Sequence, residues 1–434
     1  MVELTVALLA GLIVAMGIVA LSREATNTFH EEARVSVAEA SLRAAMDRLR
    51  GDLQRAGYMS TGNIATDPNL ATLPGQTNTH GISPTLVGIV GLQSILLVPG
   101  ESNNVLPLSA QNGLAPDQIE ISGNFTTADS YDVAMVMPAG SSGTCQKIYM
   151  SATSPAMVRL LSAGNGELQV AFQPDNASQF IVRLVDDSGR SQFLVTCAGP
   201  GAAGIDPANQ LPYINVDTSS SATPLRTAAA TGTVGGLSGY AAGRAWVNPV
   251  QTVHWAITTT SNEPLQYQNA LLTQTGDGGV DPTKYDLVRS YYDALHQPVV
   301  ATTEVIAEYA ADLKFAFSVA AVPPTPVSAQ ATAPTITTYA FGDPQNAVVA
   351  SAVAPNGTAI PQRIRSIRAR IVTRTGQADR TAFIGVQPAS TESYLYRYCV
   401  VAGGCAAGST TAQWAQARTL TTEVSLPNQA KSFY

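Results

Sequence analysis

MVELTVALLAGLIVAMGIVAL, residues Met1 to Leu21, is apolar except for Glu3 and Thr5. From Leu4 onward the stretch carries no charge and no proline. At 1.5 Å per residue, these roughly 18 residues form about 27 Å of helix, which is enough to cross the hydrocarbon of a bilayer. The sequence therefore predicts a membrane-length apolar helix with a carboxylate close to its start.

The helical pattern continues past this stretch to about Tyr58, but from Thr26 onward charged residues are interleaved with apolar ones. The apolar positions recur at three- and four-residue intervals, and they are Val35, Ala38, Leu42, Ala45, Met46, Leu49, Leu53 and Ala56. That spacing predicts one apolar stripe that docks on another part of the protein. Gly57 is a suitable helix stop. A helix of this length would reach on the order of 85 Å.

Beyond Tyr58 the pattern changes to short alternating runs separated by Gly, Pro, Asn, Asp and Ser. The runs that read as strands are Gln118–Ser122, Val133–Met137, Leu168–Phe172, Phe180–Val185, Gln192–Thr196, Thr252–Ile257, Leu313–Phe317, Ile364–Val372 and Tyr394–Val401. We therefore expect an α+β chain, in which a long helix over residues 1–58 precedes a large antiparallel β-rich head over residues 59–434.

Two stretches of low complexity interrupt the head. Gly199–Gly243 is rich in Ala, Gly, Ser and Thr, and Ala320–Pro334 is rich in Ala, Pro and Val. Both compositions are typical of loops or linkers. The head could be divided near residues 200–245, or this region could be a long surface insertion in a single head.

Composition argues against nucleic-acid binding, because the 434 residues carry a net charge of -7. The densest basic cluster is Arg363, Arg365, Arg368, Arg370 and Arg374. It alternates with isoleucines and a valine, which predicts a strand with one solvated face rather than a nucleic-acid site. The chain lacks the common nucleophile, phosphate-loop and zinc-protease motifs, so we expect neither an enzyme nor a cofactor. His254 alternates with apolar neighbours and reads as a packed or hydrogen-bonded histidine.

Four cysteines, an even number in a chain built to cross a membrane, predict disulfides in an oxidising compartment. The VVAGG segment between Cys399 and Cys405 would let a hairpin bring these two together. Cys145 and Cys197 would then form the second pair, although four cysteines allow three connectivities. A zinc site is the alternative, but neither a C-x2-C spacing nor a nearby histidine occurs.

One acidic loop could hold a hard cation. The segment GDGGVDPTKYD offers the carboxylates of Asp277, Asp281 and Asp286. Its spacing does not follow the EF-hand pattern, and acidic glycine-rich turns are common without metal. We keep these residues as a weak calcium candidate.

The first 21 residues allow simpler interpretations than an assembly helix. A cleaved secretory signal normally starts with basic residues and ends at a small-residue cleavage site, and neither is present here. A plain signal anchor would explain the apolar span but would not explain Glu3. An ionised carboxylate in lipid costs at least ~2.5 kcal/mol on insertion scales, so such a residue usually has a partner. Glu3 could also snorkel at the lipid interface.

The apolar segment resembles the N-terminus of type IV pilins and pseudopilins, in which a hydrophobic helix begins a few residues before a Glu-Leu pair. In that family the Glu is usually the fifth residue of the mature chain, whereas here it is the third residue. Further segments resemble the PilW-type minor pilins in the expected order, and they are Asp47–Tyr58, Gly113–Tyr131, Val305–Phe317, Ile364–Arg374 and Arg418–Gln429.

The resemblance implies a filament subunit, most closely a minor pilin at or near the tip of a type IV pilus that helps to initiate assembly. A main structural pilin and a minor pseudopilin of type II secretion are the alternatives. Glu3 would neutralise the N-terminal amine of a neighbouring subunit and so set register. The residues that would form the filament core are Leu4, Val6, Leu8, Leu9, Leu12, Ile13, Val14 and Ile18.

The resemblance also implies partners and a location. The partners would be other pilins and the pilus assembly machinery. The subunit would wait in the bacterial inner membrane with its head outside the cytoplasm, and it would become extracellular in the assembled pilus.

Overall fold

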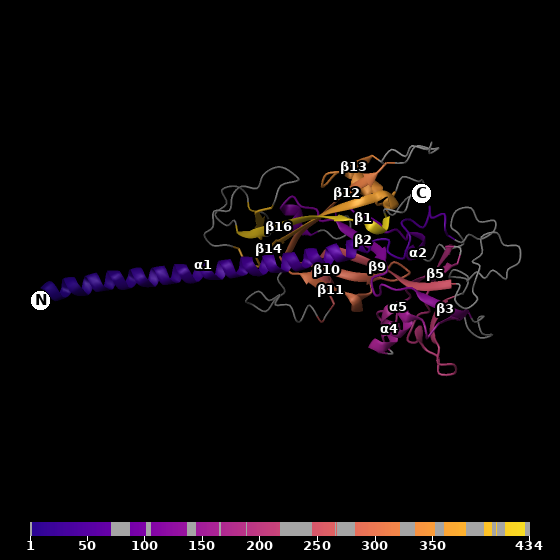
Figure 1. Ribbon diagram of the computed structural model, residues 1–434. Coiled ribbons are helices and arrows are strands. Elements are labelled where there is room, and N and C mark those ends of the chain that lie inside the picture. The colour runs from indigo at the N-terminus through magenta and orange to yellow at the C-terminus, as the bar shows by residue number, and fades with distance from the viewer. Residues whose placement is uncertain are drawn as a thin grey trace.

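The protein is described from a computed structural model, which defines residues 2–70, 87–100, 106–136, 145–164, 166–187, 189–217, 245–264, 266, 283–321, 335–351, 360–378, 395–401, 405 and 413–429. A single long helix leads into a β-rich head (Figure 1). The expected order of a long apolar N-terminal helix followed by an antiparallel β-rich head is confirmed.

Helix α1 (Val2–Gln54) is 53 residues long, which corresponds to about 80 Å. Its first half projects away from the head, and its second half lies along the head (Figure 1). The helix ends four residues before the expected Tyr58, because the chain turns at Gly57, where φ is +70°. The Gly57 N–H donates to Ser122 O at 2.9 Å, so the turn is held by the head.

Among the described residues, eleven strands form the larger sheet, and their pairings are antiparallel. These strands are β1 (Ile95–Val98), β2 (Gln118–Gly123), β3 (Tyr131–Val136), β4 (Cys145–Met150), β5 (Ile181–Asp186), β6 (Ser191–Val195), β7 (Ala203–Ile205), β8 (Pro212–Asp217), β9 (Ala245–Thr259), β10 (Tyr285–Tyr292) and β11 (Glu304–Ala307). The 15-residue β9 organises this sheet, since it pairs with β2, β3, β5 and β10 along its length.

A second sheet of five described strands has the order β13-β12-β14-β16-β15. Its strands are β12 (Ala310–Ala320), β13 (Ile336–Thr338), β14 (Ile364–Arg374), β15 (Arg397–Cys399) and β16 (Trp414–Ser425). The short helices around the sheets are α2 (Val87–Val90), α3 (Pro107–Gln111), α4 (Pro155–Ala163), α5 (Glu167–Phe172) and α7 (Pro344–Val349). Single 3-10 turns occur at η1 (Thr260–Asn262), η2 (Val300–Thr302), η3 (Pro361–Arg363) and η4 (Pro427–Gln429).

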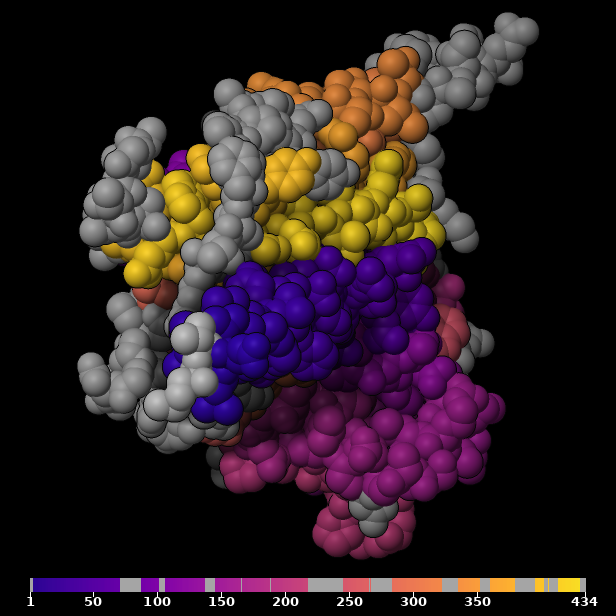
Figure 2. All heavy atoms as spheres, turned by 90° about the vertical axis from the view of Figure 1, so that its left-hand side faces the viewer, coloured from indigo at the N-terminus to yellow at the C-terminus, as the bar shows by residue number. Residues whose placement is uncertain are grey.

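The main core lies where α1 meets both sheets. It joins buried side chains of α1 to those of β2, β9 and β10 on one side and of β12, β14 and β16 on the other. In Figure 2 the indigo atoms of α1 form a band at the surface, between the yellow atoms of β16 above and the magenta atoms of the lower part of the head. The helix is therefore part of the core of the head, because its apolar stripe packs between the two sheets.

A second core lies under α4 and α5, which pack against β3, β4 and β8. Here one expectation is wrong, since Leu168–Phe172 forms the helix α5 and not a strand. Leu168, Ala171 and Phe172 are the buried residues of this segment, and their i, i+3, i+4 spacing is helical. In so short a run, Leu168, Val170 and Phe172 also satisfy the alternation expected of a strand.

The other expected strands are present with shifted ends, and they lie within or overlap β2, β3, β5, β6, β9, β12, β14 and β15. The loop expectation for Gly199–Gly243 is wrong at its start, because β7 and β8 occupy Ala203–Asp217. Alternate residues of β8 are buried, so it is an ordinary half-buried strand. Of Ala320–Pro334, only Ala320 and Ala321 lie within the described residues.

The arginine-rich segment is the strand β14, as expected, but its arginines do not share one solvated face. Arg370 and Arg374 are buried. Arg370 Nη2 donates to Asp312 Oδ2 at 2.9 Å, and the Arg374 guanidinium lies over the Tyr309 and Tyr398 rings. The reason is that β14 lies inside its sheet, between β12 and β16.

Candidate functional site

The first half of α1 exposes apolar side chains on every side. The eight residues expected in a filament core are between 57 and 67% exposed, and they are Leu4, Val6, Leu8, Leu9, Leu12, Ile13, Val14 and Ile18. Consecutive helical residues point about 100° apart, so Leu12, Ile13 and Val14 alone face most directions. This helix is long and apolar enough to cross a membrane. So large an exposed apolar surface marks a site of contact with lipid or protein.

Glu3 lies in the first turn of α1 and is exposed. A carboxylate in this position interacts favourably with the positive end of the helix dipole. The eight apolar residues follow it directly along the same helix. The structure therefore places a negative charge at the far end of the apolar segment from the head.

The second half of α1 is fixed to the head by its apolar stripe. Leu42, Ala45, Met46, Leu49 and Leu53 of α1, and Ala56 just after its end, are all buried, and they belong to the main core. The stripe is buried from Leu42 onward, whereas Val35 and Ala38 are only half-buried. The helix thus leaves the head gradually, over about two turns.

A buried ion pair lies within this stripe. Arg289 Nε on β10 donates to Asp52 Oδ2 at 2.7 Å, and Trp255 Nε1 on β9 donates to the same oxygen at 3.0 Å. The side chains of Arg289 and Asp52 are 2% and 7% exposed. Burial alone would lower the pKa of Arg289, but the charge and hydrogen bond of Asp52, together with those of Tyr291, outweigh burial and raise the pKa. The Arg289 guanidinium therefore stays charged, and its hydrogen bond to Asp52 joins the helix to the middle of the larger sheet.

Weaker contacts surround this anchor. Arg48 Nη2 lies 3.3 Å from Glu304 Oε2, and Arg418 Nε lies 3.0 Å from Glu39 Oε1. All four side chains are more than a third exposed, so each ion pair contributes about 0–1 kcal/mol. At the end of α1, Asn428 Nδ2 donates to Gln54 O at 2.8 Å, so the last part of the chain satisfies a terminal carbonyl of the helix.

Both disulfides have the pairing expected from the spacing, Cys145 with Cys197 and Cys399 with Cys405. The first joins the start of β4 to the residues just after β6. The second closes a short loop that starts at the end of the edge strand β15. These four are the cysteines of the chain, and none of them is free.

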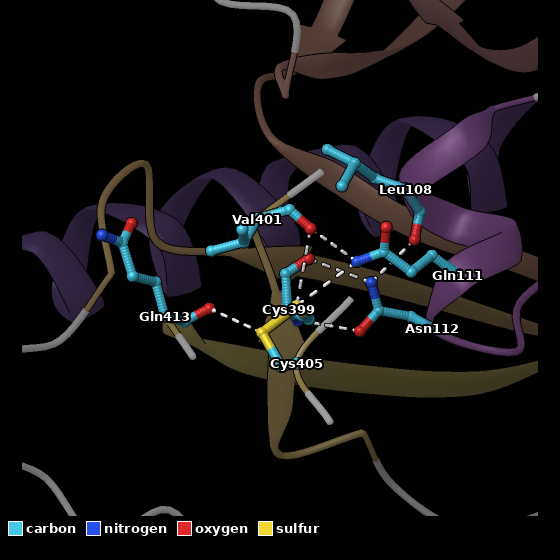
Figure 3. Close-up of a disulfide and its surroundings, with 7 residues drawn as sticks. All are labelled: Leu108, Gln111, Asn112, Cys399, Val401, Cys405 and Gln413. Atoms are coloured by element: carbon cyan, nitrogen blue, oxygen red, sulfur yellow. Dashed lines mark hydrogen bonds between the residues drawn. A yellow bond between two sulfur atoms is a disulfide. The ribbon is translucent and has the colours of Figure 1, made fainter. Parts of the chain in front are cut away.

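Helix α3 closes the edge of the five-stranded sheet beside the second disulfide (Figure 3). The Cys399 N–H donates to Asn112 Oδ1 at 2.7 Å, and Asn112 Nδ2 donates to Cys399 O at 3.1 Å. Gln111 Nε2 donates to Val401 O at 2.7 Å. The two amides thus occupy backbone groups that another strand would use, so this part of the edge is closed to strand addition.

The calcium candidate lies mostly outside the described residues, which exclude Asp277 and Asp281. Asp286 is on β10, fully buried, and its Oδ2 lies 3.2 Å from Lys284 Nζ. Glu308 Oε2 is 2.9 Å from the same ammonium group. Burial, and then the charge of Asp286, raise the pKa of the neighbouring Glu263 to about 8. A lysine ammonium therefore supplies the positive charge at the end of this loop, and no metal-binding group occurs within the described ranges.

His254 is packed and hydrogen-bonded, as the sequence predicted. It is buried on β9, its Nε2 lies 3.1 Å from Gln118 Oε1, and its ring stacks on Tyr292 with centroids 4.8 Å apart. Burial lowers its pKa, so the imidazole stays neutral. We find no arrangement of a base and a nucleophile around it among the residues that the structure defines.

The buried ion pair of Asp52 and Arg289 was not predicted from the sequence, although the position of Asp52 gave an indication of it. Asp52 lies three residues after Leu49 and directly before Leu53, so it falls on the apolar stripe. A carboxylate at a core position needs a buried partner. The partner itself, 237 residues further along the chain, could not be identified from spacing.

Comparison with known proteins identifies no relative: no family model, no curated protein and no solved structure matches this chain.

Proposed function

We propose that this chain is a structural subunit of a type IV pilus, and most closely a minor pilin of the PilW type at or near the filament tip. The observation that carries the proposal is the division of α1 into two halves. One half exposes apolar side chains in every direction, and the other is part of the core of the head. The resemblance of the first 21 residues to pilin N-termini supports the same assignment.

The proposed mechanism uses the apolar half twice. Before assembly it spans the inner membrane and holds the head outside the cytoplasm. On extraction by the assembly machinery it packs against the helices of neighbouring pilins, so that contacts with lipid are exchanged for contacts with protein. Both environments are apolar, and the exchange therefore exposes little apolar surface to water.

Glu3 sets the register of this packing in the proposed mechanism. Its carboxylate pairs with the N-terminal amine of a neighbouring subunit inside the apolar bundle. A buried charge without its partner costs several kcal/mol, so a subunit that is out of register is disfavoured. The anchored half of α1 then fixes the position of the head relative to this pair.

The size of the head favours a position at or near the tip. The two sheets make a bulky body beside a single helix (Figure 1). Bulk of this kind limits close repetition along a thin fibre. The protein would then act as a structural partner of other pilins and would need no cofactor.

The test is to shear extracellular filaments from the native cells and to quantify this chain against every other pilin by mass spectrometry. A trace amount beside one abundant small pilin is the expected result. Dominance of this chain would make it the main structural pilin. Its absence from filaments would overturn the proposal and leave a secretion pseudopilin or a membrane-anchored protein.

A further inference from the structure

Three segments that are distant in the sequence bring a lysine and three carboxyl groups together at the start of β10. Lys284, just before the strand, is fully buried, and so is Asp286, its second residue. Glu263, just after η1, is also buried, whereas Glu308, between β11 and β12, is partly exposed. The proposed function makes use of none of these four groups.

Lys284 and Asp286 lie on the same face of the chain. Alternate residues of an extended segment point to the same side, and Tyr285 between them belongs to the main core on the other side. Lys284 Nζ lies 3.2 Å from Asp286 Oδ2 and 2.9 Å from Glu308 Oε2. A primary amine is therefore held against a buried carboxyl group, with a second carboxylate also in contact.

Two donors act on the carboxyl group of Asp286. The Tyr309 N–H donates to Oδ1 at 3.0 Å, so it can stabilise negative charge that develops on this oxygen when the carbon is attacked. Glu263 and Asp286 share a hydrogen bond. Two carboxyl groups can share one only when one of them is protonated. Burial, and then the charge of Asp286, raise the pKa of Glu263 to about 8, so Glu263 holds this proton at neutral pH.

Lys284 starts as an ammonium group. Burial lowers its pKa, but the hydrogen bonds and charges of Glu308 and Asp286 outweigh burial and raise it. An amine is a nucleophile only after it has lost a proton, and Glu308 is the base in contact with Nζ that also reaches solvent. This proton transfer is uphill, but the reaction takes place only once in the life of each chain.

The reacting groups are held in place from the five-stranded sheet. Arg374 on β14 donates to the carbonyl oxygen of Thr283, and its guanidinium lies over the Tyr309 ring at 4.9 Å. These contacts fix the residue before Lys284 and the residue whose N–H binds Asp286. Groups held in a well-oriented geometry react with effective molarities of roughly 10⁵–10⁸ M, which favours a condensation that does not proceed between free groups in water.

We propose that Lys284 and Asp286 form an intramolecular amide bond in the folded head. Nζ attacks Asp286 Cγ, a C–N bond forms, and the bond from Cγ to Oδ2 breaks. The ammonium nitrogen loses two of its protons, and Oδ2 leaves with two protons as water. Glu308 takes a proton from Nζ, Glu263 delivers one to Oδ2, and both end as they began. The product replaces two buried charges with a neutral amide, whether or not the chain enters a filament.

The test is a tryptic map of the full chain, purified in detergent and with both disulfides reduced. Trypsin cuts after a lysine only when its amine is free, so an unmodified chain yields the separate peptides 245–284 and 285–289. We expect instead one joined peptide, 245–289, that is lighter than its sequence mass by one water molecule. Its tandem spectra should contain no backbone fragments that separate Lys284 from Asp286, because the amide closes a ring between them.

Variants test the roles of the carboxyl groups. Asp286→Ala removes the carbon that is attacked, so trypsin should cut completely after Lys284. Glu263→Gln keeps the shape of the side chain but cannot deliver a proton. In chains harvested soon after synthesis it should lower the yield of joined peptide by about tenfold or more, because a general acid contributes roughly 10²–10⁴-fold. Glu167→Gln, at an exposed position, is the control and should give the wild-type yield. Fluorescence of the buried Trp255 checks that each variant is folded.

The possible results have distinct meanings. Complete cleavage after Lys284 in the wild-type chain would overturn the proposal. Loss of water from peptide 285–289, with Lys284 still cut, would show cyclisation of Asp286 alone and would also overturn it. A link from Lys284 to the peptide that contains Glu308 would move the bond to the other carboxylate. A folded Glu263→Gln variant with an unchanged yield would contradict the proton transfer from Glu263. None of these results depends on whether the chain occurs in filaments, so the proposed function is tested separately.

Discussion

Replacement of Asp52 by alanine should loosen the attachment of α1 to the head. The change removes the acceptor of two buried hydrogen bonds, from Arg289 at 2.7 Å and Trp255 at 3.0 Å. It leaves the guanidinium, which is 2% exposed, with Glu304 Oε1 at 3.6 Å as its remaining carboxylate. Breaking a buried pair in this way costs about 3–5 kcal/mol, and the nearby Glu304 places Asp52→Ala toward the lower end, at about 3 kcal/mol.

The assay is urea unfolding of the full chain in detergent, followed by tryptophan fluorescence, because Trp255 is fully buried beside the anchor. Glu39→Ala is the control, since it removes an exposed ion pair with Arg418 and should cost no more than about 1 kcal/mol. The double variant Asp52→Leu with Arg289→Met removes both charges at once. Its free energy of unfolding should return to within about 1 kcal/mol of the wild-type value.

Two results would refute this reasoning. Asp52→Ala could cost less than about 1 kcal/mol, which would mean that the pair adds nothing beyond an exposed ion pair. The double variant could instead be as unstable as the single one, and the loss would then come from packing and not from an unpaired buried charge.

Three further predictions concern the head. Burial, and then the charge of the adjacent Asp286, raise the pKa of Glu263 to about 8 in the folded state against 4.5 ordinarily. The free energy of unfolding should therefore fall as pH rises from about 4.5 to about 8, and Glu263→Gln should reduce that slope in urea unfolding at several pH values, whereas Glu167→Gln, at an exposed position, should leave it unchanged. Leu49→Ala should lower the free energy of unfolding by about 2–5 kcal/mol, measured by the same titration, because Leu49 is completely buried where α1 meets both sheets. Loss of the Cys145–Cys197 disulfide, which spans 52 residues, should destabilise the chain by about 4 kcal/mol. Loss of the Cys399–Cys405 disulfide, which spans 6 residues, should cost only about 2 kcal/mol. Calorimetry of the paired Cys→Ser variants measures both losses.

The local sequence was sufficient to predict secondary structure where one hydrophobic period continues through a long segment. The apolar segment and the stripe from Leu42 to Ala56 needed only composition and 3.6-residue spacing to predict α1 and its docked side. The strand β14 is long, rich in β-branched residues and was predicted to within two residues of its end, whereas the prediction Thr252–Ile257 covered only the second half of β9. Such segments keep their structure because tertiary contacts reinforce the local preference.

In other places, tertiary contacts determine the conformation or the burial of a residue. The residues Leu168–Phe172 satisfy both a strand and a helix pattern, and the contact of α5 with the second core selects the helix. Arg370 carries a charge that favours solvent, but Asp312 neutralises it inside the sheet. In both cases the deciding partner lies far away in the sequence, so no local window contains it.

The sequence by itself determined that a long apolar helix precedes a β-rich head and that its spacing favours the observed pairing of four cysteines. Both follow from interactions along a short stretch of chain, namely the helical period and the reach of a hairpin. Only the tertiary structure decided that Asp52 meets Arg289 and that Lys284 lies between Asp286 and Glu308. These contacts depend on how β9, β10 and α1 pack together. Because the charges are buried, each of them would be costly without its partner.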